Sequence, residues 1–280
     1  MTDDNKKNSS SQLFEFTKDS YLDRTSRPIY ALTYLIGFIL LYEAGTFLIS
    51  TDVLSSSLGN TQVRVVSFAW IQNLLMDYLN FPARMTWIAT PLVVMVILLA
   101  LQITSKTQWK VTASDFMPMT IECILLAVPL IVLSLMLNRS ATEQMVAMNA
   151  GGATSELAVQ LVSGIGAGIY EELVFRLILI SLLMMLFQDF LGVTRRNSII
   201  LSVLISAVMF SLHHHIFFMN GSFTSGEEFV LSVFVFRIMA GIYFAVIFAI
   251  RGFAIAVGTH AFYDILAALL NFWVFAGPDA

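Results

Sequence analysis

The chain has little charge and almost no cysteine. Of its 280 residues, 12% are charged and 58% are hydrophobic, whereas soluble domains carry about 25% charged and about 45–50% apolar residues. This scarcity of charge excludes an ordinary soluble domain and indicates a membrane protein with one compact helical domain. The one cysteine, Cys123, excludes an internal disulfide framework and a cysteine-based metal site. The basic residues form no patch, so nucleic-acid binding has no support.

Seven apolar segments are long enough to cross about 30 Å of hydrocarbon. They lie at 29–50, 86–104, 116–137, 157–187, 198–218, 229–250 and 253–275. The stretch 62–82 is ambiguous, because Arg64, Gln72 and Asp77 give it the pattern of an amphipathic interfacial helix. An eighth span there would reverse the orientation of every later segment. The sequence thus predicts an all-α, polytopic transmembrane helical bundle of about seven (seven to eight) spans with a polar intramembrane cavity.

Basic residues decide the orientation of the spans. With seven spans and the N-terminus inside, the inner segments carry Lys6, Lys7, Lys18, Arg24, Arg27, Lys106, Lys110, Arg195, Arg196 and Arg251. The outer segments carry only Arg64, Arg84 and Arg139. Because cytoplasmic loops are enriched in lysine and arginine, we expect a cytoplasmic N-terminus. We recognise no organelle signal in this short chain, so we expect a multi-pass integral protein of a prokaryotic plasma (inner) membrane.

Two adjacent carboxylates, Glu171 and Glu172, stand in the middle of the fourth apolar segment. Charges at bilayer depth cost about 2.5–3.5 kcal/mol each on the insertion scale and usually mark function. Arg176 follows one helical turn on and can pair with Glu172, since residues four apart share a face. Glu171 would point about 100° away and could act as a general base or acid. The alternative is a buried ion pair that only joins helices. Gly164 and Gly168 predict a close helix–helix contact upstream.

All four histidines also fall in apolar segments. His213, His214 and His215 end the fifth segment, and consecutive residues fan out around a helix, so at most two of them can face one site. His260 lies in the last segment, and Asp264 shares its face and could orient its ring. The alternatives are an interfacial polar cap for the histidine run and a purely helix-linking pair for His260 and Asp264.

The same residue types raise the question of a metal. Two histidines and a glutamate can bind zinc, but the His-Glu-x-x-His helix signature is absent. A divalent metal such as zinc, held by Glu171, His214 and His260, therefore stays open. It stands beside a metal-free scheme in which Glu171 and a histidine deprotonate a water while other donors hold the oxyanion.

Three motifs in this order resemble the CAAX protease and bacteriocin-processing (CPBP, or Abi) family, which includes the type 2 CAAX prenyl endopeptidases. The family pattern is Glu-Glu-x-x-x-Arg, Phe-x-x-x-His and His-x-x-x-Asn or Asp, each in its own hydrophobic segment. Here the motifs are Glu171-Glu172-Leu-Val-Phe-Arg176, Phe210-Ser-Leu-His-His214 and His260-Ala-Phe-Tyr-Asp264. We accordingly divide the chain into a cytoplasmic polar tail (1–28), an N-terminal transmembrane region with an extracytoplasmic amphipathic segment (29–115) and a CPBP-like intramembrane protease core (116–275).

The resemblance implies a role for each matched residue. Glu171 and His214 would activate the attacking water, while His260 and Asp264 would bind or polarise the scissile carbonyl. Members that process prenylated proteins have Asn where this chain has Asp264; aspartate donates only when protonated, which favours Asp264 as an orienter of His260. The implied catalytic set is Glu171, Glu172, His214, His260 and Asp264, with Arg176 and Phe210 as supporting residues.

The resemblance implies an intramembrane endopeptidase. Its partners would be membrane lipids and a membrane-associated or lipid-modified peptide or protein, in CAAX-type processing or in bacteriocin maturation and self-immunity. One alternative is a non-catalytic immunity or regulatory partner. Another is a proton-coupled transporter, although no pair of interrupted helices stands in matching halves. Its relay would comprise Glu43, Glu122, Glu171, Glu172, Arg237 and Asp264.

Overall fold

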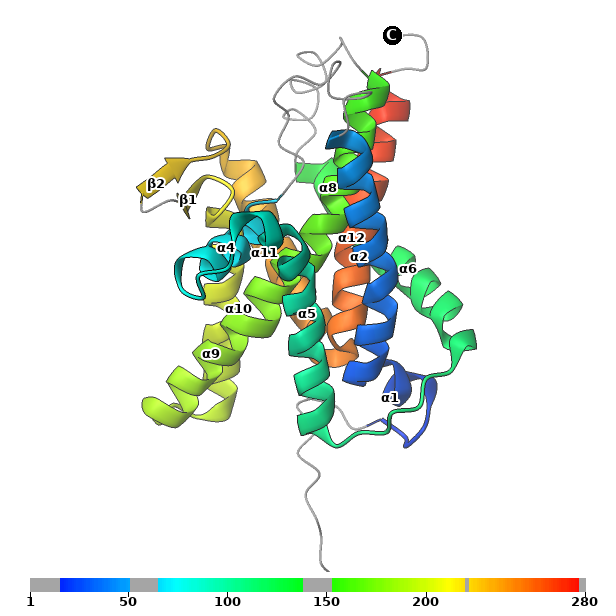
Figure 1. The fold of residues 1–280 in the computed structure, drawn as a ribbon, viewed down its shortest axis with the longest axis vertical. Coiled ribbons are helices and arrows are strands. Elements are labelled where there is room, and N and C mark those ends of the chain that lie inside the picture. Colours follow the sequence, from blue (N-terminus) through cyan, green and yellow to red (C-terminus); the bar gives the residue numbers. More distant parts are fainter. Residues whose placement is uncertain (1–15, 51–64, 138–152, 220–221, 277–280) are drawn as a thin grey trace, which may run out of the picture.

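The protein is a bundle of helices with one small hairpin of strands (Figure 1). A computed structural model describes residues 16–50, 65–137, 153–219 and 222–276. Its α-helices are α1 (Tyr21–Thr25), α2 (Pro28–Ser50), α4 (Val66–Asp77), α5 (Ala83–Ser105), α6 (Phe116–Leu137), α8 (Ala153–Glu171), α9 (Ile180–Met184), α10 (Arg195–Leu212), α11 (Leu231–Arg251) and α12 (Phe253–Leu270). A 3-10 turn, η1 (Ala113–Asp115), precedes α6, and π-helical turns form η2 (Glu172–Leu179), η3 (Met185–Phe190) and η4 (Asn271–Ala276). The antiparallel strands are β1 (Ile216–Met219) and β2 (Ser222–Ser225).

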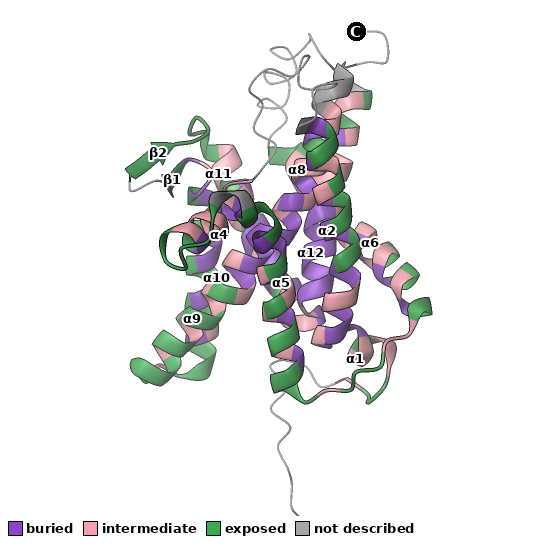
Figure 2. Ribbon diagram, in the orientation of Figure 1, coloured by how far each residue is buried: buried purple, intermediate pink, exposed green. Residues whose placement is uncertain are grey.

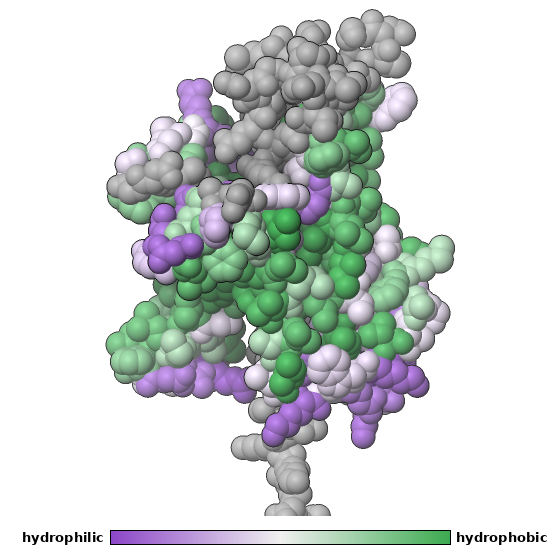
Figure 3. Space-filling model, in the orientation of Figure 1, coloured by the Kyte–Doolittle hydropathy of each residue, from purple (hydrophilic) through white to green (hydrophobic). Residues whose placement is uncertain are grey.

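Seven helical segments of the described residues are long and apolar enough to cross a membrane, which confirms the predicted all-α polytopic bundle. The hydrophobic side chains spread over the middle of the molecule, with hydrophilic ones along its lower edge (Figure 3). Helix α4 has 12 residues and is about 18 Å long at 1.5 Å per residue, too short for an eighth span. A helix is therefore present within the ambiguous stretch, and its position at the membrane interface stays a prediction. Arg64 lies outside the described residues.

The fifth span ends earlier than the sequence pattern predicts. Helix α10 stops at Leu212 rather than at 218, and the chain turns through the three histidines into β1. The physical reason is local: Asn220-Gly221, a pair typical of two-residue hairpin turns, follows β1 in the sequence. Strand pairing with β2 supplies backbone partners that a longer helix would otherwise have supplied.

Helices α8 and α12 pack closely at the centre of the bundle, beside α2 (Figures 1 and 2). A Cβ on Gly168 would lie 2.8 Å from the backbone nitrogen of Ala261 and 2.9 Å from the backbone oxygen of Val257. A Cβ on Gly164 would lie 2.6 Å from the Cβ of Asp264. The small-residue face predicted from the sequence therefore permits this approach, and it brings Glu171 on α8 near His260 on α12.

We expect Gly168→Ala to lower the free energy of unfolding by about 1–3 kcal/mol, the usual cost of overpacking. The added methyl group would meet backbone atoms of α12, which cannot rotate away. Gly37→Ala is the matched control, because a Cβ on Gly37 meets nothing within 4 Å and alanine favours a helix. Thermal unfolding in detergent would measure both variants, and equal midpoints would contradict this account of the contact.

The segment before the first span is fastened to the bundle at the end opposite the hairpin (Figure 1). Tyr21 donates a hydrogen bond of 2.7 Å to Glu122, whose carboxylate also pairs with Arg251 at 2.5 Å. Arg251 further donates to Thr25 at 3.0 Å. These contacts form a clasp, defined by Tyr21, Thr25, Glu122 and Arg251, that joins α1, α6 and the C-terminal end of α11.

Candidate functional site

The acidic pair lies where the fourth span changes from an α-helix to a π-helix. Glu171 is the last residue of α8, and Glu172 is the first residue of the π-helical turn η2. Short π-helical insertions in α-helices often occur at functional sites. The wider turn leaves the Phe175 carbonyl to accept a hydrogen bond of 2.7 Å from Ser206 on α10. Both carboxylates are buried, with Glu171 5% and Glu172 0% exposed, so their charges require partners inside the protein.

Glu172 finds its partner in Arg176, as the spacing of four predicts. The Nε of Arg176 lies 3.1 Å from Oε2 of Glu172, and both side chains are fully buried. The guanidinium also lies 4.2 Å from the centre of the Phe210 ring and donates to the Gly241 carbonyl at 3.4 Å. Phe210 therefore supports the arginine through a cation–π contact, and the ion pair joins η2 to α10 and α11.

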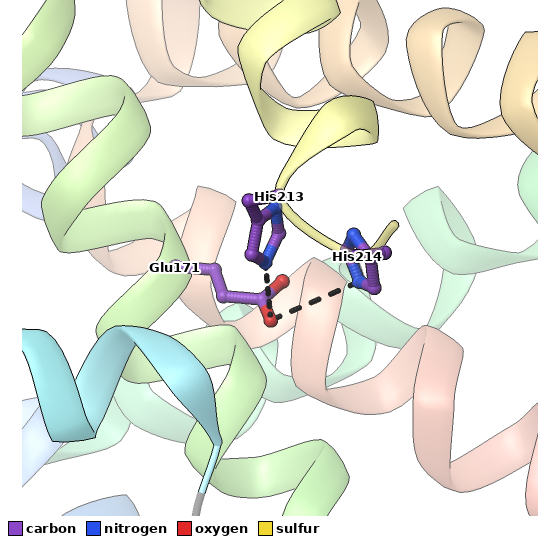
Figure 4. Close-up of side chains that lie close together, drawn as sticks. All are labelled: Glu171, His213 and His214. Carbon is purple, nitrogen blue, oxygen red and sulfur yellow. Dashed lines mark hydrogen bonds and ion pairs between the residues drawn. The ribbon is translucent and has the colours of Figure 1, made fainter. Parts of the chain in front are cut away.

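Two neighbouring histidines face Glu171 from the turn after α10 (Figure 4). The Nε2 of His213 lies 3.4 Å, and that of His214 4.0 Å, from Oε1 of Glu171. The Nδ1 atoms of both rings lie within hydrogen-bond distance of the same Phe210 carbonyl, at 2.5 and 3.0 Å. A carbonyl can only accept, so both rings carry a proton on Nδ1, and a neutral ring then presents a lone pair on Nε2. His215 turns away, with its Nδ1 3.1 Å from the Glu227 carbonyl.

His213 was the residue that the sequence motifs passed over. The family pattern selects His214, but the structure places His213 nearer to Glu171. Its ring packs between Phe175, at 4.7 Å, and Trp70 of α4, at 5.8 Å between ring centroids. Burial lowers the pKa of His214 well below its usual range, and the neighbouring His213 adds to this effect, which supports a neutral imidazole there.

His260 on α12 completes the cluster from the opposite side. Its Nδ1 is 2.8 Å from Oε1 of Glu172, while its Nε2 is 3.8 Å from Oε2 of Glu171 and 3.6 Å from Oδ2 of Asp264. The ring stacks on Phe244 at 4.4 Å with an angle of 14° between the planes. Sequence spacing favoured Asp264 as the orienter of this ring, but the hydrogen bond within normal range comes from Glu172.

A metal ion could fit one part of this cluster. Oε1 of Glu171 and the Nε2 atoms of His213 and His214 converge, and the ligand atoms of these residues lie within 4.8 Å of one another. Tetrahedral zinc holds its nitrogen and oxygen ligands about 3.4 Å apart, as follows from bonds of about 2.0–2.1 Å. The sequence pointed to Glu171, His214 and His260, so the structure exchanges His260 for His213 in the candidate ligand set.

Seven apolar helices that enclose carboxylates, imidazoles and an arginine define a multi-pass membrane protein with a polar site among its helices. Residues 153–266 match the model of the family described as Type II CAAX prenyl endopeptidase Rce1-like, which confirms the resemblance inferred from the three motifs. No curated protein and no solved structure matches the chain. The family match supports a CAAX-type intramembrane endopeptidase as the general class.

Proposed function

We propose that the protein hydrolyses a peptide bond of a membrane-associated or lipid-modified peptide with a water activated by Glu171 and the neighbouring histidines. The observation that carries this proposal is one buried carboxylate with three imidazole nitrogens within 4.0 Å of its oxygens. Glu171 takes a proton from the water, whose oxygen bonds to the carbonyl carbon, and gives that proton to the amine nitrogen as the C–N bond breaks. His213 or His214 holds the water by its Nε2 lone pair. This division assigns general base catalysis to a group within reach of the reacting atoms.

In this proposal His260 acts on the scissile carbonyl and not on the attacking water. As an imidazolium it donates from Nδ1 to Glu172 and presents Nε2–H to the oxygen of the scissile carbonyl, where negative charge develops in the transition state. Glu172, held by Arg176, fixes the ring by the hydrogen bond of 2.8 Å. Asp264, with 27% of its side chain exposed, lies at the edge of the cluster and adds a second carboxylate beside Nε2.

Peptide cleavage by the purified protein in lipid tests this function. A panel of membrane-tethered peptides, prenylated and unmodified, would be incubated with the protein, and the products would be identified by mass spectrometry. Glu171→Gln serves as the inactive control. A folded wild-type protein that cleaves none of them would contradict the proposal and favour the non-catalytic partner. Survival of the cellular phenotype in Glu171→Gln would assign that phenotype to the partner role.

The positions of the charged residues do not support the transporter alternative. Glu122 belongs to the clasp at the opposite end of the bundle, paired with Arg251. Arg237 pairs with Glu227 at 2.7 Å, in the segment that follows the hairpin. These pairs hold neighbouring segments together, whereas Glu171, Glu172 and Asp264 of the proposed relay lie in the cluster.

We also infer that Glu171, His213 and His214 can hold zinc, which when bound lowers the pKa of its water ligand toward 7. Elemental analysis is expected to find about one zinc per wild-type chain after loading and removal of excess metal. His213→Ala is expected to lose it and His215→Ala to retain it, because His215 faces Glu227. If His260→Ala lost zinc and His213→Ala retained it, the ligand set expected from the sequence, Glu171, His214 and His260, would be correct. No zinc in the wild type would leave the metal-free scheme.

A further inference from the structure

The outer edge of β1 is a backbone surface that leads to the histidine turn. The Gly226 amide donates to the His215 carbonyl at 2.8 Å, so the carbonyl of residue 215 points toward the chain that continues from β2. Bonded and non-bonded pairs alternate along antiparallel strands. Since Phe218 faces Phe223 three pairs further on, that pair is a non-bonded one. The amide and carbonyl of Phe218 therefore point away from β2.

A side chain already uses this edge. The indole Nε1–H of Trp70, on α4, donates a hydrogen bond of 3.0 Å to the Phe218 carbonyl, which confirms that this carbonyl points outward from the hairpin. The same Trp70 ring packs against His213 and Phe175, at 5.8 and 6.2 Å between centroids. Trp70 thus lies between the strand edge and the catalytic cluster (Figure 1 shows α4 beside the hairpin).

The hairpin is joined firmly to the cluster. The Glu227 amide donates to the His214 carbonyl at 2.8 Å, so a further backbone hydrogen bond ties the segment after β2 to the histidine turn. Phe218 is four residues beyond His214, which is about 13 Å along an extended strand. If a peptide pairs with Phe218 along β1, its residue about four positions further along would lie beside the histidine turn and Glu171.

We propose that the outer edge of β1 binds the peptide substrate as an added strand, and that the Trp70 indole takes the place of a substrate N–H on the Phe218 carbonyl until substrate arrives. This proposal rests on the proposed peptidase function. Exposed strand edges attract further strands, and peptide recognition by strand addition draws its affinity from main-chain hydrogen bonds. An extended backbone is also the form in which a peptide bond is accessible to an attacking water.

Proline substitutions on the two edges of the hairpin test the proposal. Phe218→Pro removes the outward N–H of β1, and Phe223→Pro removes the outward N–H of β2 on the opposite edge. Neither change removes a bond between the strands, because both residues belong to one non-bonded pair. Binding of the tethered peptide that the wild type cleaves fastest would be measured with each proline variant placed in Glu171→Gln protein in lipid.

Phe218→Pro is expected to weaken peptide binding by about tenfold, the upper range for one lost backbone hydrogen bond. Phe223→Pro is expected to change binding by less than about threefold. Equal binding by the two variants would overturn the strand-addition proposal. Because binding is read without cleavage, this failure differs from that of the proposed function, in which the wild type would cleave no peptide.

Trp70→Phe keeps the proposal testable if a proline variant fails to fold. Phenylalanine retains a ring against His213 but cannot donate to the Phe218 carbonyl. If the indole competes with the substrate, KM is expected to fall by about two- to tenfold while kcat changes little. A rise in KM would show that Trp70 only supports the hairpin and would overturn the proposed exchange of donors.

Discussion

Replacing Glu171 with glutamine is expected to lower kcat by about 10²–10⁴-fold, the usual contribution of a positioned general base. Glutamine has nearly the same shape and keeps an oxygen toward His213 and His214, but it cannot take a proton from water. The loss should therefore fall on kcat, with KM and the unfolding temperature close to those of the wild type. Steady-state kinetics on a tethered peptide in lipid, together with thermal unfolding, would measure these quantities.

Glu227→Gln is the matched control for this substitution. Glu227 follows the hairpin, and its carboxylate pairs with Arg237 while 58% of its side chain is exposed. Exposed ion pairs contribute about 0–1 kcal/mol, so this variant should retain wild-type kinetics. If Glu171→Gln kept more than a tenth of the wild-type kcat, Glu171 would not be the general base.

Arg176→Met is expected to lower the free energy of unfolding by about 3–5 kcal/mol, the cost of leaving one charge of a buried ion pair without its partner. Arg176 and Glu172 are both 0% exposed, so no water can replace the guanidinium. Adding Glu172→Gln should restore most of the lost stability, because removal of both charges is often neutral. Denaturant titration in mixed micelles would measure both variants.

Arg196→Met provides the comparison at an exposed arginine, where we expect a change within about 0.5 kcal/mol. A measurement of activity separates the two roles of Glu172, which are to pair with Arg176 and to hold His260. The double variant should be stable yet slower than the wild type, because an amide at 172 holds an imidazolium at His260 less well than a carboxylate does. A single Arg176→Met variant as stable as the wild type would contradict an ionised Glu172.

Rules of helix spacing predicted those parts of the site that lie within one helix. The pairing of Glu172 with Arg176 follows from four residues on one face, and the close contact of α8 with α12 follows from Gly164 and Gly168. The pairing of particular side chains across two helices was beyond such rules. Nothing in the spacing shows that Glu172 of η2, rather than Asp264 of the same helix, would hydrogen-bond His260.

The sequence pattern places the end of the fifth span after the histidines, because the apolar run Ile216-Phe217-Phe218 has the composition of a helix end. The structure ends the helix before them. A helix would spread consecutive rings around its axis, so the spacing limits one site to at most two of the three histidines, and the family motif selects His214 alone. The turn instead directs both Nδ1 atoms at the Phe210 carbonyl. Asn220-Gly221 was the available signal for a hairpin, and reading it would have ended the fifth span before the histidines.

The clasp at the start of the chain also sets an order of events during synthesis. Glu122 and Arg251 are 129 residues apart, and ribosomes add about 5–20 residues per second. Helix α6 must therefore wait roughly 6 to 26 seconds for the arginine that pairs with its glutamate. Because Arg251 is the last residue of α11, two residues before α12 begins, the clasp closes only shortly before the helix that carries His260 is made. Assembly of the third and sixth spans is thereby coupled, and a chain that stalls within α11 would leave Glu122 without Arg251.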